Sequence, residues 1–98
     1  MAYEIIWLPK AEERYQQIVD YLQEEWNDKV VIKFIAITQQ KLFQIKQRPK
    51  MYRRSAKRNI YEALITKHNL LLYRIVGNKI ELLTFFDTRR RPSKKFKY

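Results

Sequence analysis

The chain has 98 residues, of which 46% are apolar, and it contains one glycine and no cysteine. This length suits one small domain with a modest core, and the lack of cysteine excludes disulfides, thiolate metal sites and cysteine nucleophiles. The formal net charge of +11 favours an anionic partner. We therefore expect a single domain over residues 1–98, ending in a basic tail at 88–98.

The first half of the chain predicts a strand followed by two helices. Residues 2–8, AYEIIWL, are rich in β-branched and aromatic side chains, which favours a strand. Pro9 suits the first position of a helix, and apolar residues then recur at spacings of three and four up to about residue 25. We expect Asp28 to cap a second helix that ends near Gln47, before Pro49. Helices joined by so short a turn run antiparallel, as a helical hairpin.

The rest of the chain predicts three strands joined by tight turns. The runs at 58–66, 69–76 and 79–86 are strand-like, and Gly77-Asn78 between the last two is a hairpin signal. The middle run is almost entirely apolar, as in a strand covered on both faces. We expect an α+β fold of order β-α-α-β-β-β. It is an antiparallel sheet with the N-terminal helical hairpin on one face and the other face free.

The sequence predicts no membrane segment, metal or cofactor. The N-terminus lacks a basic start, and its apolar run is interrupted at Glu4 and Pro9, unlike a signal peptide. No stretch reaches the ~20 apolar residues that span a bilayer. One histidine, no cysteine and no glycine-rich phosphate loop argue against a metal site or a bound cofactor. The predicted location is the cytoplasm.

The positive charge lies almost entirely in the second half of the chain. Residues 1–47 carry six Lys/Arg and seven Asp/Glu, whereas residues 48–98 carry fifteen and three, a net charge of +12. On the free face and rims of the sheet, such residues would form a concave positive surface for a phosphate backbone or an acidic peptide. Charge kept only for solubility is the alternative. The basic residues expected to bind a partner are Arg58, Lys67, Arg74, Arg89, Arg90 and Arg91.

Three further residues invite a functional interpretation. His68 lies in the turn between two strands, where it is either an exposed turn residue or a general base or phosphate contact. We expect Trp7 and Trp26 in the core or at its edge, with base stacking as the alternative. The acids of the first helix are interpreted as a solvated face rather than as paired catalytic carboxylates.

Four stretches resemble the RelE/ParE superfamily of toxins from bacterial type II toxin–antitoxin modules. They are the opening strand with Trp7 followed by AEERYQQIVDYL, the segment LFQIKQRP, the run LLLYRI with Tyr73-Arg74, and the exit FFDTRRRP. The exit is similar to the Arg-Arg-acid-Pro ending of the ParE branch, although Arg91 stands in place of the acid. The chain therefore resembles the ParE branch more closely.

The resemblance implies a protein that arrests growth and is neutralised by a cognate antitoxin with an acidic toxin-binding segment. RelE-like members cleave mRNA on the ribosome, using basic residues that stabilise the reacting phosphate. Their places correspond here to Tyr61, Ala63 and Leu70, and Arg89 or Arg90 matches the arginine after the last strand. The His–Tyr pair of another ribonuclease branch falls on arginines. ParE-like members bind DNA gyrase and need no catalytic residue.

We therefore predict a ParE-like toxin that arrests growth by binding DNA gyrase. The first alternative is a ribosome-dependent mRNA endoribonuclease with a rearranged catalytic set that includes His68 and Tyr61, with Arg89 and Arg90 as further catalytic candidates. The second alternative is a non-toxic RNA-binding module, which would bind RNA with strong salt dependence.

Overall fold

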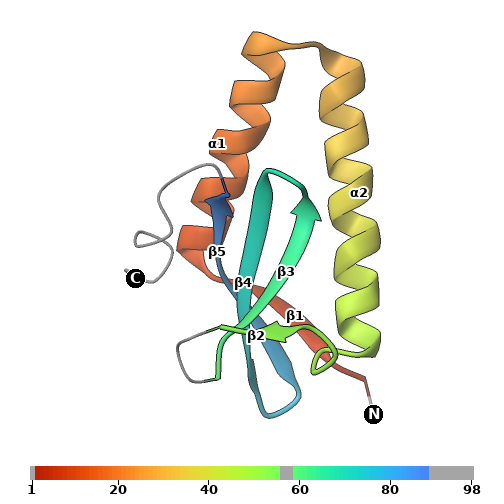
Figure 1. Ribbon diagram of the computed structural model, residues 1–98, viewed down its shortest axis with the longest axis vertical. Coiled ribbons are helices and arrows are strands. Elements are labelled where there is room, and N and C mark those ends of the chain that lie inside the picture. Colours follow the sequence, from red (N-terminus) through yellow and green to blue (C-terminus); the bar gives the residue numbers. More distant parts are fainter. Residues whose placement is uncertain (1, 56–58, 89–98) are drawn as a thin grey trace.

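Strands and helices follow one another in the order β-α-α-β-β-β-β through the part of the chain that the computed structural model describes, residues 2–55 and 59–88. Figure 1 shows the two helices side by side along the sheet. The elements are β1 (Glu4–Trp7), α1 (Pro9–Glu25), α2 (Asp28–Gln47), β2 (Arg53–Arg54), β3 (Tyr61–Thr66), β4 (Asn69–Val76) and β5 (Lys79–Asp87). The predicted α+β class is confirmed.

The strands form one mixed sheet in the order β1-β5-β4-β3-β2. β3, β4 and β5 make the predicted antiparallel meander, whereas β1 runs parallel to β5, with Glu4 opposite Lys79 and Trp7 opposite Leu82. The sheet is thus not wholly antiparallel. The composition of a four-residue edge strand does not reveal whether it runs parallel or antiparallel to its neighbour. The helical hairpin supplies the long crossover connection that a parallel neighbour requires.

The predicted helix boundaries are confirmed, with a correction at the start of α2. Asn27, rather than Asp28, is the N-cap, because its side-chain oxygen accepts a hydrogen bond from the Val30 amide at 3.1 Å. This contact satisfies one of the amides that have no partner within the helix. β2 is an additional strand, and two residues are too few to show an alternating pattern.

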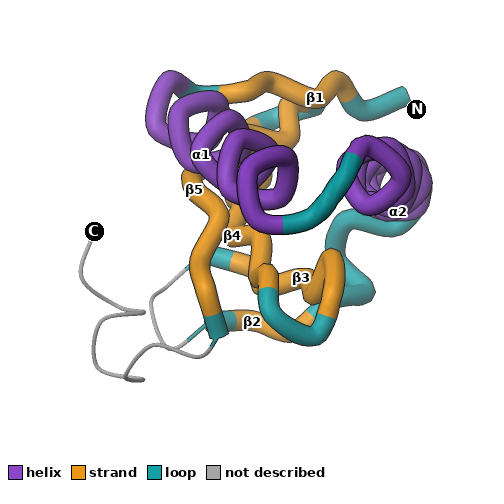
Figure 2. Tube along the Cα trace, turned by 90° about the horizontal axis from the view of Figure 1, so that it is seen from above, coloured by secondary structure: helices purple, strands orange, loops and turns teal. Residues whose placement is uncertain are grey.

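The helical hairpin covers one face of the sheet, as predicted (Figure 2), with α1 packed against β5 and α2 packed against β3 and β1. The apolar side chains of this layer come from both helices and from the three long strands. The buried members are Ala11, Phe34, Leu42, Ile45, Tyr61, Ala63, Ile65, Leu71, Tyr73, Ile80, Leu82 and Phe85. The hairpin and the meander therefore share one core.

The opposite face of the sheet is not free, which corrects the sequence-based prediction. Leu70, Leu72 and Leu83 form a second buried cluster there, packed with partly buried apolar neighbours. Leu72 is only 1% exposed. The middle strand is apolar in both of its alternating phases, so it buries side chains on both faces. A fully open, concave basic face is therefore absent from the described part of the sheet.

The two tryptophans have different environments. Trp7 is half-buried and stacks on Phe85 with 5.8 Å between ring centroids, while Tyr15 meets it edge-on at 5.2 Å. Trp26 is 64% exposed, so its predicted place in or beside the core is wrong. It is the C-cap of α1, at the tip of the helical hairpin, and this tip extends past the sheet (Figure 1). None of the described strands lies under Trp26 to bury it.

Candidate partner-binding site

The turn that carries Lys67 and His68 is fastened to the end of β5. The Thr88 amide donates to the His68 carbonyl at 3.0 Å, and the Thr88 hydroxyl donates to the Lys67 carbonyl at 2.7 Å. Within the turn, the His68 amide donates to the Thr66 hydroxyl. Thr88, which directly precedes the run of three arginines in the sequence, therefore lies beside Lys67 and His68. Both of these side chains are exposed.

Arg74 lies apart from this turn, on the opposite end of β4. Its Nε donates to Glu81 Oε1 at 2.6 Å, and the two side chains are 49% and 20% exposed. Five residues of strand separate Arg74 from the turn end of β4, a distance of roughly 17 Å. Arg58, Arg89, Arg90 and Arg91 lie outside the described residues. The predicted binding residues that the structure describes therefore do not form a single cluster.

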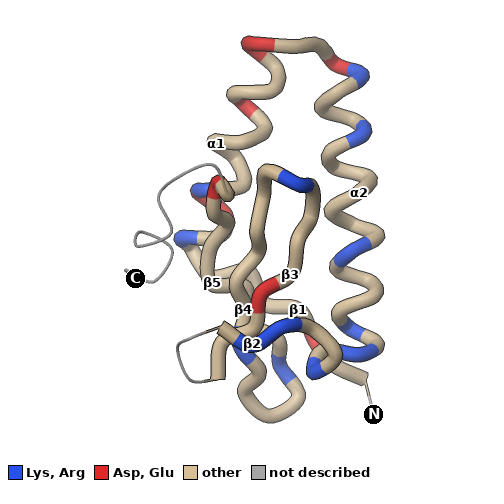
Figure 3. The backbone as a smooth tube through the Cα atoms, viewed as in Figure 1, with Lys and Arg blue, Asp and Glu red and all other residues tan. Residues whose placement is uncertain are grey.

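A third basic region extends from the second half of α2 to β2. It consists of Lys41, Lys46, Arg48, Lys50, Arg53 and Arg54, and we call it the α2–β2 basic surface. Residues 29–61 contain no Asp or Glu, and Figure 3 shows the Lys and Arg residues along α2 and on β2. The ion pair Arg74–Glu81 is the only one between two described residues. None of these cations therefore forms an ion pair with a described residue, and Glu62 is the acid that lies opposite Arg53 in the β2–β3 pair.

Three tyrosines lie beneath the α2–β2 basic surface. Tyr61 stacks on Tyr73 with 5.4 Å between ring centroids, and Tyr52 meets Tyr73 edge-on at 6.4 Å. The guanidinium of Arg54 lies 5.7 Å from the centre of the Tyr61 ring, and Lys41 Nζ lies 5.8 Å from that of Tyr52. Cations at this distance interact favourably with the ring face. Because Tyr61 is only 9% exposed, it orients Arg54 and does not offer a surface for base stacking.

Tyr73 joins the tyrosine cluster to the segment after α2. Its hydroxyl donates a 2.6 Å hydrogen bond to the carbonyl of Pro49, and both residues are buried. Burial raises the pKa of Tyr73, and the neighbouring Tyr52 and Tyr61 add to this increase because their charged forms would repel a Tyr73 phenolate. The hydroxyl therefore stays protonated at neutral pH and can hold the α2–β2 segment against the core.

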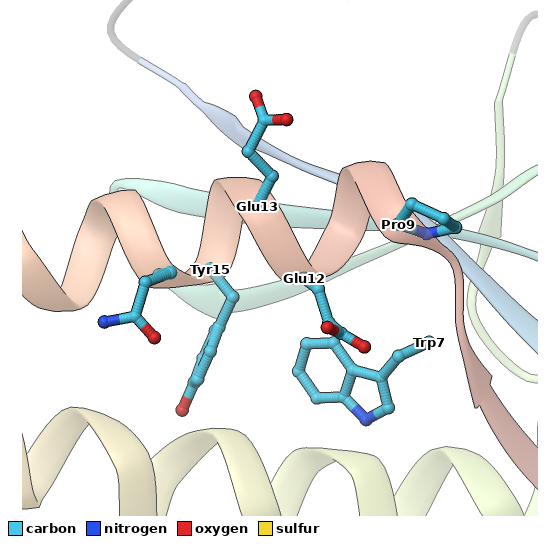
Figure 4. Close-up of a pocket in the computed structure, with 6 residues that line it drawn as sticks. Trp7, Pro9, Glu12, Glu13 and Tyr15 are labelled. Atoms are coloured by element: carbon cyan, nitrogen blue, oxygen red, sulfur yellow. The ribbon is translucent and has the colours of Figure 1, made fainter.

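A shallow groove of about 620 Å³ lies at the start of α1 (Figure 4). Trp7, Glu12 and Tyr15 point to the α2 side of α1, whereas Glu13 points away. Burial raises the pKa of Tyr15, an effect that the nearby Thr38 hydroxyl opposes. The Thr38 hydroxyl donates its hydrogen bond to the Phe34 carbonyl, and the buried Tyr15 hydroxyl makes no hydrogen bond to a described residue.

The described residues show no arrangement typical of metal or nuclease chemistry. Across residues 2–55 and 59–88 no group of three His, Cys, Asp or Glu residues is placed to hold a metal, and neither helix is long and apolar enough to cross a membrane. Tyr61, Ala63 and Leu70, which occupy the places of the RelE cations, are 9%, 1% and 5% exposed. These three positions therefore belong to the two apolar clusters.

The fold is shared with solved toxin structures. The chromosomal ParDE system from P. aeruginosa superposes with a TM-score of 0.75 at 15% identity, over 87% of this chain and 95% of that one. The YoeB dimer from Staphylococcus aureus gives 0.59 at 20% identity, over 86% and 94%. The DinJ–YafQ complex from E. coli gives 0.60 at 7% identity, over 91% and 96%. These likenesses establish the fold alone.

The chain thus has the fold that these solved toxins share. No curated protein sequence matches the chain significantly. The family model for the ParE toxin of the type II toxin–antitoxin system parDE matches residues 5–92. The chain therefore belongs to the ParE toxin family. The resemblance that the four sequence stretches indicated is confirmed.

Proposed function

We propose that the protein arrests growth by binding DNA gyrase, that it performs no bond-breaking chemistry itself, and that a cognate antitoxin neutralises it in the cytoplasm. Membership of the ParE family supports this proposal. The observation that carries the choice of target is the absence of cations from the strand where RelE-like nucleases need them.

β3 has the sequence YEALIT, which contains no Lys or Arg in either alternating phase. A one-residue change of register exchanges the two faces of a strand, so no choice of register brings a cation onto β3. β4 holds only Arg74, which is paired with Glu81. Stabilising a pentavalent phosphate requires cations close to the reacting atoms. The described sheet therefore supports a binding function rather than an RNA-cleaving one.

The α2–β2 basic surface supports an acidic antitoxin as the neutralising partner. Its cations have no acidic neighbours in sequence over residues 29–61, and the described ones form no ion pairs with described residues. Arg54 and Lys41 are oriented by tyrosine rings, which lowers the entropy lost when they bind an anionic group. Electrostatic complementarity of this kind speeds association with a partner of opposite charge.

We further propose that Arg89, Arg90 and Arg91 contribute to target engagement or antitoxin docking, together with Lys67 and Arg74. The hydrogen bonds of Thr88 to the Lys67 and His68 carbonyls support this, because they hold the residue that precedes Arg89 beside the exposed turn that carries Lys67. We expect the triple change Arg89, Arg90, Arg91→Ala to abolish growth arrest without changing the thermal midpoint. The matched control is Lys94, Lys95, Lys97→Ala, which removes the same charge from the same tail.

The test of the target is a short induction of the chain without its antitoxin. Purified chain should inhibit DNA supercoiling by gyrase, and mRNA 5′ ends mapped across translated genes should be unchanged. The arginine variant should lose the inhibition, and the lysine variant should keep it. Cleavage within codons, with gyrase unaffected, would contradict the proposal. An equal loss of gyrase inhibition in both variants would show that the total charge of the tail, rather than the three arginines, is responsible.

A ribosome-dependent endoribonuclease is the second candidate, and one observation favours it. The Thr88–His68 hydrogen bond puts an exposed histidine beside the residue that precedes Arg89. A histidine side chain can act as a general base. On this candidate, His68→Ala would abolish codon-dependent cleavage, whereas gyrase inhibition does not depend on that side chain.

A further inference from the structure

α2 has a second apolar side that points to solvent. Its core side is buried against the sheet and α1, yet Ile32, Ile35 and Phe43 are 66%, 38% and 61% exposed. Figure 2 shows α2 at one side of the molecule, where no described element covers its outer surface. Contiguous apolar side chains in solvent mark an interaction surface more often than chance exposure does.

These side chains belong to one continuous stripe. An α-helix turns by about 100° per residue, so residues spaced by three or four share a face. The stripe is formed by Asp28, Ile32, Ile35, Ala36, Gln39, Phe43 and Lys46, which are all exposed. We call it the outer stripe. Its middle is apolar apart from the polar Gln39, and one end carries an acid while the other end carries a base.

We propose that the outer stripe is the contact between two copies of this chain, which pack their α2 helices antiparallel about a two-fold axis. The axis passes between Ala36 and Gln39. Ile32 of each copy then meets Phe43 of the other, and Asp28 of each copy meets Lys46 of the other. A two-fold interface uses the same patch on both copies, so each contact occurs twice.

The spacing of the residues fits this arrangement. Asp28 and Lys46 are eighteen residues apart, which is five full turns, so both point in the same direction from the helix axis. In an antiparallel pair of helices, Asp28 at the start of one helix therefore lies opposite Lys46 near the end of the other. Ala36 beside the axis has a small side chain, which allows the two backbones to approach closely. Antiparallel packing also places helix ends of opposite partial charge together.

Charge distinguishes a second copy from an acidic antitoxin segment as the occupant. The outer stripe carries one acid, Asp28, and one base, Lys46, which it shares with the α2–β2 basic surface, so it is self-complementary under a two-fold axis; Lys29 and Lys33 lie on α2 outside the stripe. An acidic segment would meet one base and one acid on the stripe, against the six cations of the α2–β2 basic surface. The antitoxin is better matched by the α2–β2 basic surface. The proposal does not depend on the identity of the toxin's target.

An interface of one helix from each copy lies at the lower end of the sizes seen in specific complexes, so we expect a dissociation constant on the order of micromolar. The test is sedimentation velocity on the full chain, refolded from denaturant so that no antitoxin is bound. The expected mass at high concentration is twice the 12.2 kDa of one chain. Phe43→Glu and Ile32→Glu should weaken dimerisation at least tenfold. Tyr21→Glu is the matched control, because Tyr21 is 51% exposed on α1, off the stripe, and it should leave the dimer unchanged.

A cysteine cross-link tests the geometry independently. Because the chain has no cysteine, the double change Ala36→Cys and Gln39→Cys should give a covalent dimer under mild oxidation, and Gln17→Cys on α1 should not. Lys46→Asp should weaken the dimer, and adding Asp28→Lys should restore it. A monomer at all concentrations, a dimer insensitive to Phe43→Glu, or no cross-link would each overturn the proposal. A monomeric chain whose Phe43→Glu variant loses antitoxin binding would assign the stripe to the antitoxin and likewise overturn it.

Discussion

Removing the hydroxyl of Tyr73 tests how the basic segment after α2 is held to the fold. The hydroxyl donates to the Pro49 carbonyl at 2.6 Å, across 24 residues of sequence. Tyr73 itself is 0% exposed and lies against Tyr52 and Tyr61. Tyr73→Phe keeps the ring and its stacking, so it isolates the hydrogen bond from the packing of the core.

The expected loss of stability follows from the burial of both partners. A typical hydrogen bond contributes about 1 kcal/mol net, and a buried acceptor left without a donor costs about 1–3 kcal/mol. We expect Tyr73→Phe to lower the free energy of unfolding by about 2 kcal/mol. For a domain of this size, that loss corresponds to a fall in the thermal midpoint of roughly 8–16 °C.

The assay is urea unfolding of the wild type, Tyr73→Phe and Tyr52→Phe. Tyr52 is half-buried and its hydroxyl bonds to no described residue, so its loss should change stability by less than about 0.5 kcal/mol. Equal midpoints for wild type and Tyr73→Phe would refute the reasoning, since another donor would then satisfy the Pro49 carbonyl. Equal losses in both variants would show that the effect comes from the rings rather than from the hydrogen bond.

Three further predictions follow from the same contacts. Because burial raises the pKa of Tyr73, the stabilisation of the fold by its protonated hydroxyl is complete below the unfolded pKa of about 10 and is lost as pH rises above that value. Thermal midpoints measured from pH 8 to about 11 should therefore decline less steeply for Tyr73→Phe than for the wild type. Parallel curves for the two proteins would contradict this prediction. Asn27→Ala removes the cap of α2 and should cost about 1 kcal/mol in urea unfolding, whereas Asn27→Asp should restore the stability. Arg74→Gln breaks a half-exposed ion pair with Glu81 and should lower the free energy of unfolding by less than about 1 kcal/mol, and so should the control Lys79→Gln. A clearly larger loss of stability for Arg74→Gln would show that the ion pair is structural. Loss of toxicity at unchanged stability would support a role of Arg74 in binding.

The helices and the meander were predictable because their signals are local. The apolar spacing of α1 and α2, Pro9 at the start and Pro49 after the end set both helices to within one residue. Gly77 has φ of +62° in the predicted hairpin turn, a conformation that glycine adopts without steric cost. The resemblance to the superfamily was likewise visible in the sequence, because it was carried by four short stretches and their order along the chain.

The candidate site was less predictable because it depends on which distant residues meet. Lys67 and Arg74 look like neighbours in a list of basic residues, yet they lie at opposite ends of β4 and only Arg74 is ion-paired. The orientation of Arg54 by Tyr61 depends on the pairing of β2 with β3. A two-residue strand has no pattern that predicts such a pairing.

The sequence by itself determined the class of fold, the two helices, the meander and the position of the positive charge, since each depends on residues within one or two turns or strands. Only the tertiary structure decided that β1 runs parallel to β5, that Leu70 and Leu72 are buried on the face expected to be free, and that Trp26 is exposed. The physical reason is that direction and burial depend on what lies next to an element, and side-chain periodicity records only which face an element offers.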